Sequence, residues 1–197
     1  MQLTIHAILS NYILRYIEIS EEEVTLFQSF LKTKTYKKKD FLLNAGSVCK
    51  HRYFILNGCV RLFKIDEDGN ENIIHFGIEN WWITDYESLI QQTSSGVYIQ
   101  AIRDTEVLVL EKEQFEKLCI ALPKVERLFR IIMEKTYLAA QKRMEYMLSL
   151  SGEELFSVFM NANPQIFQII PQYMIASYLN MTPEFLSKIK AKKQVIS

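Results

Sequence analysis

The chain has 197 residues, 49% of them hydrophobic, and a formal net charge of zero, which allows one large domain or two small ones with a packed core. Acidic side chains outnumber basic ones up to residue 112, and basic ones outnumber acidic ones after it. The three cysteines are scattered. They argue against a disulfide framework, a zinc site or an iron–sulfur cluster, and favour reduced thiols in the cytoplasm. No apolar run approaches the roughly 20 residues of a membrane span, and no signal peptide is expected.

Residues 3–31 predict short helices, because Ser20 followed by Glu21, Glu22 and Glu23 is an N-cap with an acidic first turn. From residue 33 to residue 110 the pattern changes to short β-branched or aromatic runs separated by glycine turns. This change predicts an antiparallel β-roll or sandwich. Residues 66–70 predict a hairpin turn between two of the runs. The expected strands are residues 53–56, 59–65, 71–76, 97–102 and 106–110.

After residue 110 the apolar period becomes helical. A short helix is predicted to end near Pro123, and a long helix to run over residues 124–150. Apolar side chains recur along the long helix at three- and four-residue intervals, which suits packing on its own domain and on a partner copy. A long core helix is the alternative. The candidate dimer residues are Leu128, Phe129, Ile132, Met133, Thr136, Tyr137, Ala140 and Met144.

Residues 171–190 have the spacing of a helix-turn-helix. Ile175 and Leu179 lie four apart on a first helix, and Ala176 is small where a second helix must cross closely. Asn180 follows where the turn needs a left-handed residue, a conformation that asparagine tolerates better than most residues. The alternative is two ordinary packed helices.

The second helix is expected to begin with Thr182, a good N-cap, and Pro183, which fits the first helical position. Four lysines and one glutamate in residues 182–193 form a modest basic patch. In a DNA-binding helix-turn-helix the outer face of this helix enters the major groove. Its apolar face is expected to be Phe185, Leu186 and Ile189. The candidate DNA contacts are Thr182, Pro183, Glu184, Ser187, Lys188, Lys190, Lys192 and Lys193.

A β-roll, a long helix, a hinge at residues 149–152 and a C-terminal helix-turn-helix resemble, in this order, the Crp/Fnr family of bacterial transcription regulators. The likeness rests on Gly46 and on residues 54–63, 66–69, 104–110 and 175–189. It implies a homodimer whose long helices pair and whose second helices read a palindromic double-stranded DNA site, with RNA polymerase as a further candidate partner.

The resemblance implies an α+β chain in three parts. A jelly-roll-like, cyclic-nucleotide-binding-type sensor domain with N-terminal helices is expected at residues 1–122, and a dimerisation helix at residues 123–150. An all-α, winged-helix-like helix-turn-helix domain is expected at residues 151–197. By resemblance Glu184 falls where the family accepts from a cytosine amino group, and Lys188 where it usually has a guanine-reading arginine. Lysine lacks the bidentate fork of arginine, and Pro183 has no side-chain donor, so we expect a base preference unlike the family prototype.

The sequence departs from the family at the cyclic-nucleotide pocket. The resemblance requires a Gly–Glu pair for the ribose and an Arg–Ser/Thr pair for the phosphate, but Thr84, Asp85, Ser95 and Gly96 stand there instead. A buried phosphate without an arginine carries an uncompensated charge, so we expect no response to cyclic AMP. The pocket is expected to be filled by aromatic side chains, with an unknown uncharged aromatic or lipid-like effector as the alternative. The filling residues are expected to be Trp81, Trp82, Tyr86 and Tyr98.

The sequence gives little support for another type of sensor within this family or for an enzyme. Residues 1–48 lack the cysteine cluster of the family's oxygen-sensing branch, and a haem ligand among His6, His51 and His75 is disfavoured, because a histidine in a strand is more often structural. The His-x-His set of metal-dependent cupins, the P-loop, the nucleophile elbow and the dinucleotide glycine pattern do not occur. We therefore expect no cofactor, no metal and no enzymatic activity. The alternative function is a degenerate cyclic-nucleotide-type domain that binds proteins or small ligands without specific DNA binding.

Overall fold

A computed structural model of the chain describes residues 4–194, with side chains as far as Lys192. The chain divides into two compact units, and each is described by itself. The first consists of Met1–Leu62 and Phe76–Lys135, and the second of Phe63–His75 and Thr136–Ser197. These units differ from the expected boundaries, because the tip of one hairpin joins the C-terminal unit and the long helix is shared between both.

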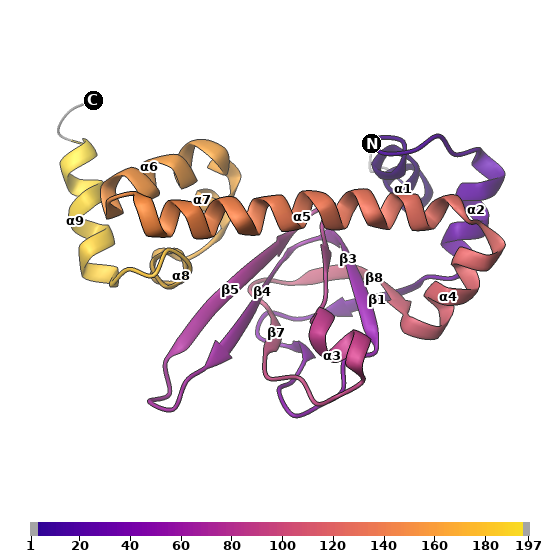
Figure 1. The fold of residues 1–197 in the computed structure, drawn as a ribbon, viewed down its shortest axis with the longest axis horizontal. Coiled ribbons are helices and arrows are strands. Elements are labelled where there is room, and N and C mark those ends of the chain that lie inside the picture. Colours follow the sequence, from indigo (N-terminus) through magenta and orange to yellow (C-terminus); the bar gives the residue numbers. More distant parts are fainter. Residues whose placement is uncertain (1–3, 195–197) are drawn as a thin grey trace. The chain divides into compact units, whose positions relative to one another are not determined.

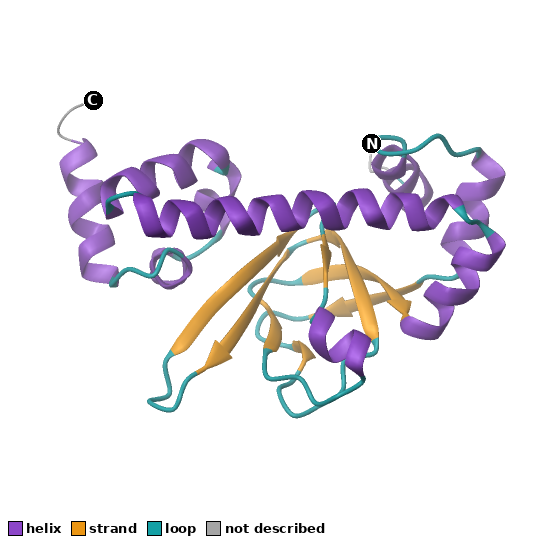
Figure 2. Cartoon of the chain, viewed as in Figure 1, coloured by secondary structure: helices purple, strands orange, loops and turns teal. Residues whose placement is uncertain are grey.

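The strands of the described residues form two four-stranded sheets, in the orders β1-β8-β3-β6 and β2-β7-β4-β5. They are drawn as orange arrows in Figure 2. Strand β8 pairs antiparallel with both β1 and β3, and its register with β3 places Leu108 opposite Phe54. The expected β-roll is confirmed. The strands are β1 Lys32–Tyr36, β2 Phe41–Leu43, β3 His51–Asn57, β4 Cys59–Ile65, β5 Glu71–Ile78, β6 Trp82–Ile83, β7 Tyr98–Ala101 and β8 Thr105–Glu111.

Successive side chains of β3 and β8 point to opposite faces of their sheet, and each face forms part of a separate hydrophobic core. Tyr53 and Ile55 point between the two sheets, while Phe54 points to the other face, where the helices pack. The Phe54 ring is fully buried, with its centroid 4.8 Å from that of Tyr12 and 5.2 Å from that of Trp82. Burial of this face against helices fixes the register, since a slip of one residue would expose it.

The helices of the first unit are α1 Ile5–Ile13, α2 Glu21–Ser29, α3 Tyr86–Gln91, α4 Lys112–Ala121 and the first half of α5 Lys124–Ser149 (Figure 1). The predicted N-cap is confirmed: Ser20 and Glu23 form a capping box at the start of α2. Helix α5 begins directly after Pro123, as the sequence indicates, and buries its first turns in the helix-side core.

The second unit combines the tip of the β4–β5 hairpin with the second half of α5 and four more helices. The predicted turn is confirmed, because the Asp66 amide donates to the Asn70 carbonyl at 3.1 Å and Gly69 has a φ of 85°. Phe156, Ile175, Ala176 and Leu186 are all at most 1% exposed. The helices are α6 Gly152–Ala162, α7 Pro164–Ile169, α8 Gln172–Tyr178 and α9 Pro183–Gln194.

Candidate nucleic-acid interface

The turn between α8 and α9 has the conformation that the sequence predicts. Asn180 is left-handed with a φ of 55°, and the Met181 amide donates to the Ala176 carbonyl at 2.9 Å. The Thr182 hydroxyl accepts from the Phe185 amide at 3.2 Å and so caps the start of α9. Ala176 is fully buried, as the close crossing of the two helices requires. These local contacts fix the direction in which α9 leaves the turn.

Helix α9 has a buried face and an exposed face. Leu186 and Ile189 are 1% and 3% exposed. Phe185, which the sequence placed on the buried face, is 43% exposed, so that part of the expectation is wrong. The exposed candidate contacts are Thr182, Pro183, Glu184, Ser187, Lys188 and Lys192, while Lys190 is half-buried.

The lysines at the end of α9 are not equivalent. Lys192 Nζ pairs with the two Glu153 carboxylate oxygens at 2.9 and 3.1 Å, which leaves it less available to a phosphate. The side chain of Lys193 lies outside the described residues. Lys188 therefore stands out as the exposed cation in the middle of the outer face of α9.

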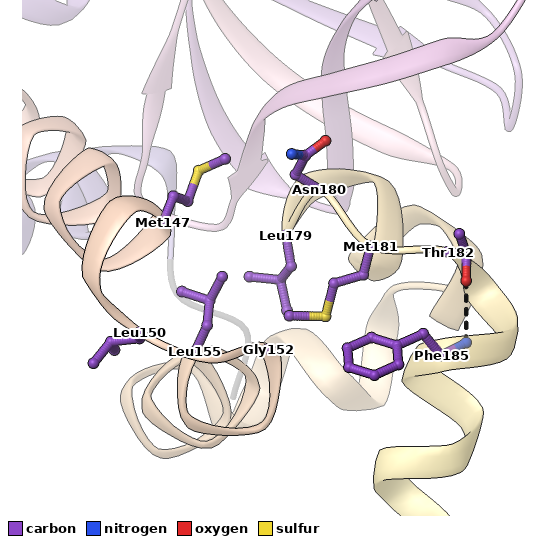
Figure 3. A pocket seen from close by; sticks show the side chains of 9 residues that line it. All are labelled: Met147, Leu150, Gly152, Leu155, Leu179, Asn180, Met181, Thr182 and Phe185. Atoms are coloured by element: carbon purple, nitrogen blue, oxygen red, sulfur yellow. Dashed lines mark hydrogen bonds between the residues drawn. The ribbon is translucent and has the colours of Figure 1, made fainter.

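Gly152 is the first residue of α6, and Phe185 lies so close to it that a side chain at this position would not fit without a shift (Figure 3). A Cβ at Gly152 would lie 2.5 Å from Phe185 Cε1 and 3.4 Å from Met181 Cε. The glycine does not have a positive φ. Gly152 thus allows close packing between α6 and the start of α9, while the hinge at residues 149–152 stays a prediction. Around this contact lies a pocket of ≈ 320 Å³ lined by Met147, Leu150, Gly152, Leu155, Leu179, Asn180, Met181, Thr182 and Phe185.

Replacing Gly152 by Ala should destabilise the second unit by about 1 kcal/mol, because the Phe185 ring must turn away to make room. Replacing Phe185 by Ala as well should remove that cost, so that urea unfolding shows a coupling of roughly 1 kcal/mol between the two sites. Gly96→Ala is the matched control, since a Cβ there would meet no atom within 4 Å. Additive effects of the two substitutions would contradict the contact.

Helix α8 covers part of the edge strand β5 within the second unit. The Ser177 hydroxyl accepts from the Ile73 amide at 3.0 Å and donates to the Glu71 carbonyl at 2.8 Å. An edge strand presents unpaired backbone groups, and one hydroxyl here satisfies two of them. Ser177 therefore holds the first helix of the helix-turn-helix on the hairpin.

Arg143 of α5 strengthens the same junction. Its Nη1 donates to the Ile74 carbonyl at 2.7 Å and its Nη2 to the Tyr178 carbonyl at 2.6 Å. The guanidinium carbon also lies 3.8 Å from the centroid of the Tyr178 ring. Sequence reasoning missed Arg143 and Ser177, because their partners are backbone groups of distant segments, which no local pattern reveals.

His75 of the hairpin makes this junction sensitive to pH. Burial, aided by the Arg143 cation, lowers the pKa of His75 to about 4. The unfolded chain binds this proton near pH 6.5 and the folded chain only near pH 4, so stability should be lost as the pH falls through that window and be constant above it. The loss should be on the order of 2 kcal/mol. Urea unfolding at pH 7 and pH 4.5 measures it. His75→Gln should remove the part of the loss that His75 causes and leave the part from His51, whose pKa burial also lowers, while His6→Gln should leave the whole loss; an unchanged pH dependence in His75→Gln would contradict this role.

The residues of the expected effector pocket do not all converge on one site. The Thr84 hydroxyl donates to the His51 carbonyl at 2.8 Å, and Asp85 caps α3 by accepting from the Ser88 amide at 3.4 Å. The Ser95 hydroxyl donates to the Val97 carbonyl at 2.9 Å within its own loop, which also contains Gly96. The side chains of Thr84, Asp85 and Ser95 thus all form hydrogen bonds with backbone groups.

The aromatic residues that were expected to fill the pocket also lie elsewhere. Trp82 packs on the helix side of the sheet, where its ring centroid is 5.1 Å from that of Phe129, and Tyr98 pairs with Phe41 at 5.7 Å. Trp81 is half-buried, and Tyr86 bonds to the side chain of Arg52. The space between the sheets is packed instead by a core that includes Leu42, Leu43, Tyr53, Ile55, Val60, Leu62, Ile83, Leu89, Ile99 and Val107.

The candidate dimer residues separate into two groups. Leu128, Phe129 and Ile132 are 0%, 5% and 9% exposed, because they form part of the core of the first unit, so they are not free to contact a partner. The other candidate residues are exposed, and so is Met147. Five of these exposed residues follow one another at alternating intervals of four and three residues, and we call these five the α5 seam: Met133, Tyr137, Ala140, Met144 and Met147. Thr136 is also exposed but lies outside this spacing.

Within residues 4–194, no helix combines the length and apolar character of a membrane span. Nor do those residues bring together three or more His, Cys, Asp or Glu side chains that could hold a metal ion.

Comparison with known proteins places the fold. Residues 33–121 match the family model of the cyclic nucleotide-binding domain. Regulatory protein HlyX of Actinobacillus pleuropneumoniae is 19% identical over 188 residues, which cover 89% of this chain and 78% of HlyX. Transcriptional activator protein Anr of Pseudomonas protegens is 21% identical over 145 residues, which cover 73% of this chain and 59% of Anr. The structure of FixK2 from Bradyrhizobium japonicum superposes with a TM-score of 0.72 at 18% identity, over 84% of this chain and 85% of FixK2.

Proposed function

We propose that this chain is a DNA-binding transcription regulator of the Crp/Fnr type that reads double-stranded DNA with α9, a proposal supported by its similarity to HlyX, Anr and FixK2. The observation that carries the proposal is the geometry of α9. Its start is fixed by the Thr182 cap, its inner face is buried through Leu186 and Ile189, and Glu184 and Lys188 project from its outer face. A helix held in this way presents its N-terminal residues to base edges in the major groove.

The roles of the exposed side chains follow from their chemistry. Glu184 is an acceptor for the amino group of cytosine, and Lys188 is a donor to the acceptors of guanine. Ser187 contacts a phosphate or base, and Lys190 a phosphate. Lys192 contributes less, because Glu153 already neutralises it.

The DNA site is read by a homodimer whose α5 seams pair. Tyr137 and Met144 are 68% and 60% exposed, which is unusual for large apolar side chains unless a partner covers them. A two-fold dimer presents its two α9 helices to half-sites about 34 Å apart, so the site is palindromic. RNA polymerase is a further partner in this proposal, and the protein acts in the cytoplasm without catalysing a reaction.

Cyclic AMP is not the effector in this proposal. Ser95 lies where the family places the arginine of its phosphate site, and its hydroxyl is bonded within its own loop. A cyclic phosphate there would be a buried charge without a counter-charge.

The proposal is tested by selection of DNA fragments with the purified full chain at two salt concentrations. Enrichment of a palindromic site with half-sites one helical turn apart is the expected result. Fragments enriched without a common sequence, or no enrichment at either salt concentration, would favour a protein- or ligand-binding module instead.

A further inference from the structure

The first unit contains a buried arginine that forms no ion pair with any of the residues that the structure describes. Arg52 on β3 is 5% exposed, and its guanidinium carbon lies 4.0 Å from the centroid of the Phe115 ring and 6.0 Å from that of Phe129. Its Nε and Nη1 have no hydrogen-bond partner among the residues that the structure describes. Buried guanidinium nitrogens are almost always paired, since their water is lost on folding.

A second orphan donor lies on the same face of the same sheet. The indole Nε1 of Trp82 is buried and also lacks a partner within the described chain. Trp82 on β6 pairs with Phe54 of β3, two residues from Arg52, so both side chains stand on the helix side of the sheet. The ring of Phe129 is 5.1 Å from that of Trp82. Three donor nitrogens and one positive charge thus lie on the one face of the sheet that also carries Phe115 of α4 and Phe129 of α5.

The groups around Arg52 do not neutralise it. Tyr86 shares a hydrogen bond with it, but burial raises the pKa of Tyr86, so its hydroxyl stays neutral. Glu116 attracts the guanidinium without forming an ion pair in the part of the chain that is described. Two aromatic rings, Phe115 and Phe129, lie near the guanidinium, and neither is a hydrogen-bond acceptor of the carboxylate kind that its N–H groups favour.

We propose that these residues form a binding site for a small monocarboxylate. We call it the Arg52 site and define it by Arg52, Trp82, Tyr86, Phe115 and Phe129. A carboxylate supplies one negative charge for one buried cation and two oxygens for the three unpaired nitrogens. A phosphate dianion would bring a second, uncompensated buried charge. The aromatic walls select a ligand whose body is apolar.

The site is placed to act on the long helix. Phe129 lies on α5, eight residues before Tyr137 of the α5 seam. A ligand that binds one arrangement of α5 better than another would shift the equilibrium between them. This consequence rests on the proposed function, whereas the binding site itself does not.

Thermal unfolding of the full chain, without DNA, tests the binding site. The probes are sodium acetate, benzoate and octanoate, with benzamide as the neutral counterpart of benzoate. At about one hundred times its dissociation constant, a bound carboxylate should raise Tm by roughly 5 °C. Benzamide should give no shift, because it does not carry the charge that Arg52 requires.

Two variants assign any response to the Arg52 site. Arg52→Met should keep or raise the Tm of the free protein, since it replaces an unpaired buried cation by an apolar chain, and it should lose the response to carboxylates. Trp82→Phe should weaken carboxylate binding measured by calorimetry, and Trp81→Phe should not. Equal shifts in wild type and Arg52→Met, equal shifts by benzoate and benzamide, or no shift by any of the three carboxylates would overturn the proposal. If Arg52→Met does not fold, calorimetry of the two tryptophan variants decides, and equal binding by both would overturn it.

Discussion

Replacing Met144 by Glu should convert the protein to a monomer and lower its affinity for a palindromic DNA site by roughly 100-fold or more. Met144 lies in the α5 seam and is 60% exposed in the single chain. In the proposed dimer the two seams face each other, so the substitution would bury two like charges without counter-charges. The loss of the second half-site contact removes the gain from bivalent binding.

Ala139→Glu is the matched control for this substitution. It adds the same charge to the same helix at another exposed position, outside the three–four spacing of the seam. Sedimentation equilibrium and a DNA titration measure the two properties together. The dimer should persist in Ala139→Glu. A Met144→Glu protein that stays dimeric would remove the α5 seam as the interface.

Replacing Arg143 by Ala should loosen the junction between the β5 end of the hairpin and α8 by about 3 kcal/mol. Two charge-assisted hydrogen bonds, to the Ile74 and Tyr178 carbonyls, are lost together with the contact to the Tyr178 ring. Hydrogen bonds to charged groups contribute about 1.5–3 kcal/mol each, and partial rehydration of the two carbonyls offsets some of the loss.

Hydrogen exchange measures this effect residue by residue. The Ile73 amide, which donates to Ser177, should lose about 100-fold in protection, while the β3–β8 amides of the first unit should not change. Arg143→Lys should be intermediate, because lysine keeps the charge but not the two-pronged geometry. Lys142→Ala is the neighbouring control and should have no effect. Unchanged protection of Ile73 in Arg143→Ala would show that Arg143 does not hold the junction.

The parts of the fold that local chemistry determines were predictable from the sequence. Asn180, Thr182 and Pro183 suit a left-handed turn, an N-cap and a first helical position, and the structure uses them in those ways. The Ser20 cap and the turn at residues 66–70 were predictable for the same reason. Strands β1, β2 and β6 were missed, because β1 is polar and largely exposed and the other two are only three and two residues long.

Partners that are distant in the sequence were not predictable. The sequence pattern of α5 does not distinguish an apolar residue that is buried in the core of the first unit, as Phe129 is, from one that is left exposed, as Tyr137 is. Trp82 was assigned to the effector pocket, but its pairing with Phe54 places it on the helix side of the sheet. Arg52 and Arg143 gave no signal, because the feature that distinguishes them is the absence or identity of their tertiary partners.

The most direct measurement of DNA reading by α9 is an equilibrium titration of wild type, Glu184→Ala and Lys188→Ala on the enriched site. It is repeated on sites with single base changes in the half-site and at two salt concentrations. Glu184→Ala should lose about 1–3 kcal/mol of discrimination at one half-site position. Lys188→Ala should lose discrimination at another position, or weaken binding to all sites with a salt slope lower by about one per subunit. Affinity, discrimination and salt slope that are unchanged in both variants would contradict the reading of DNA by α9.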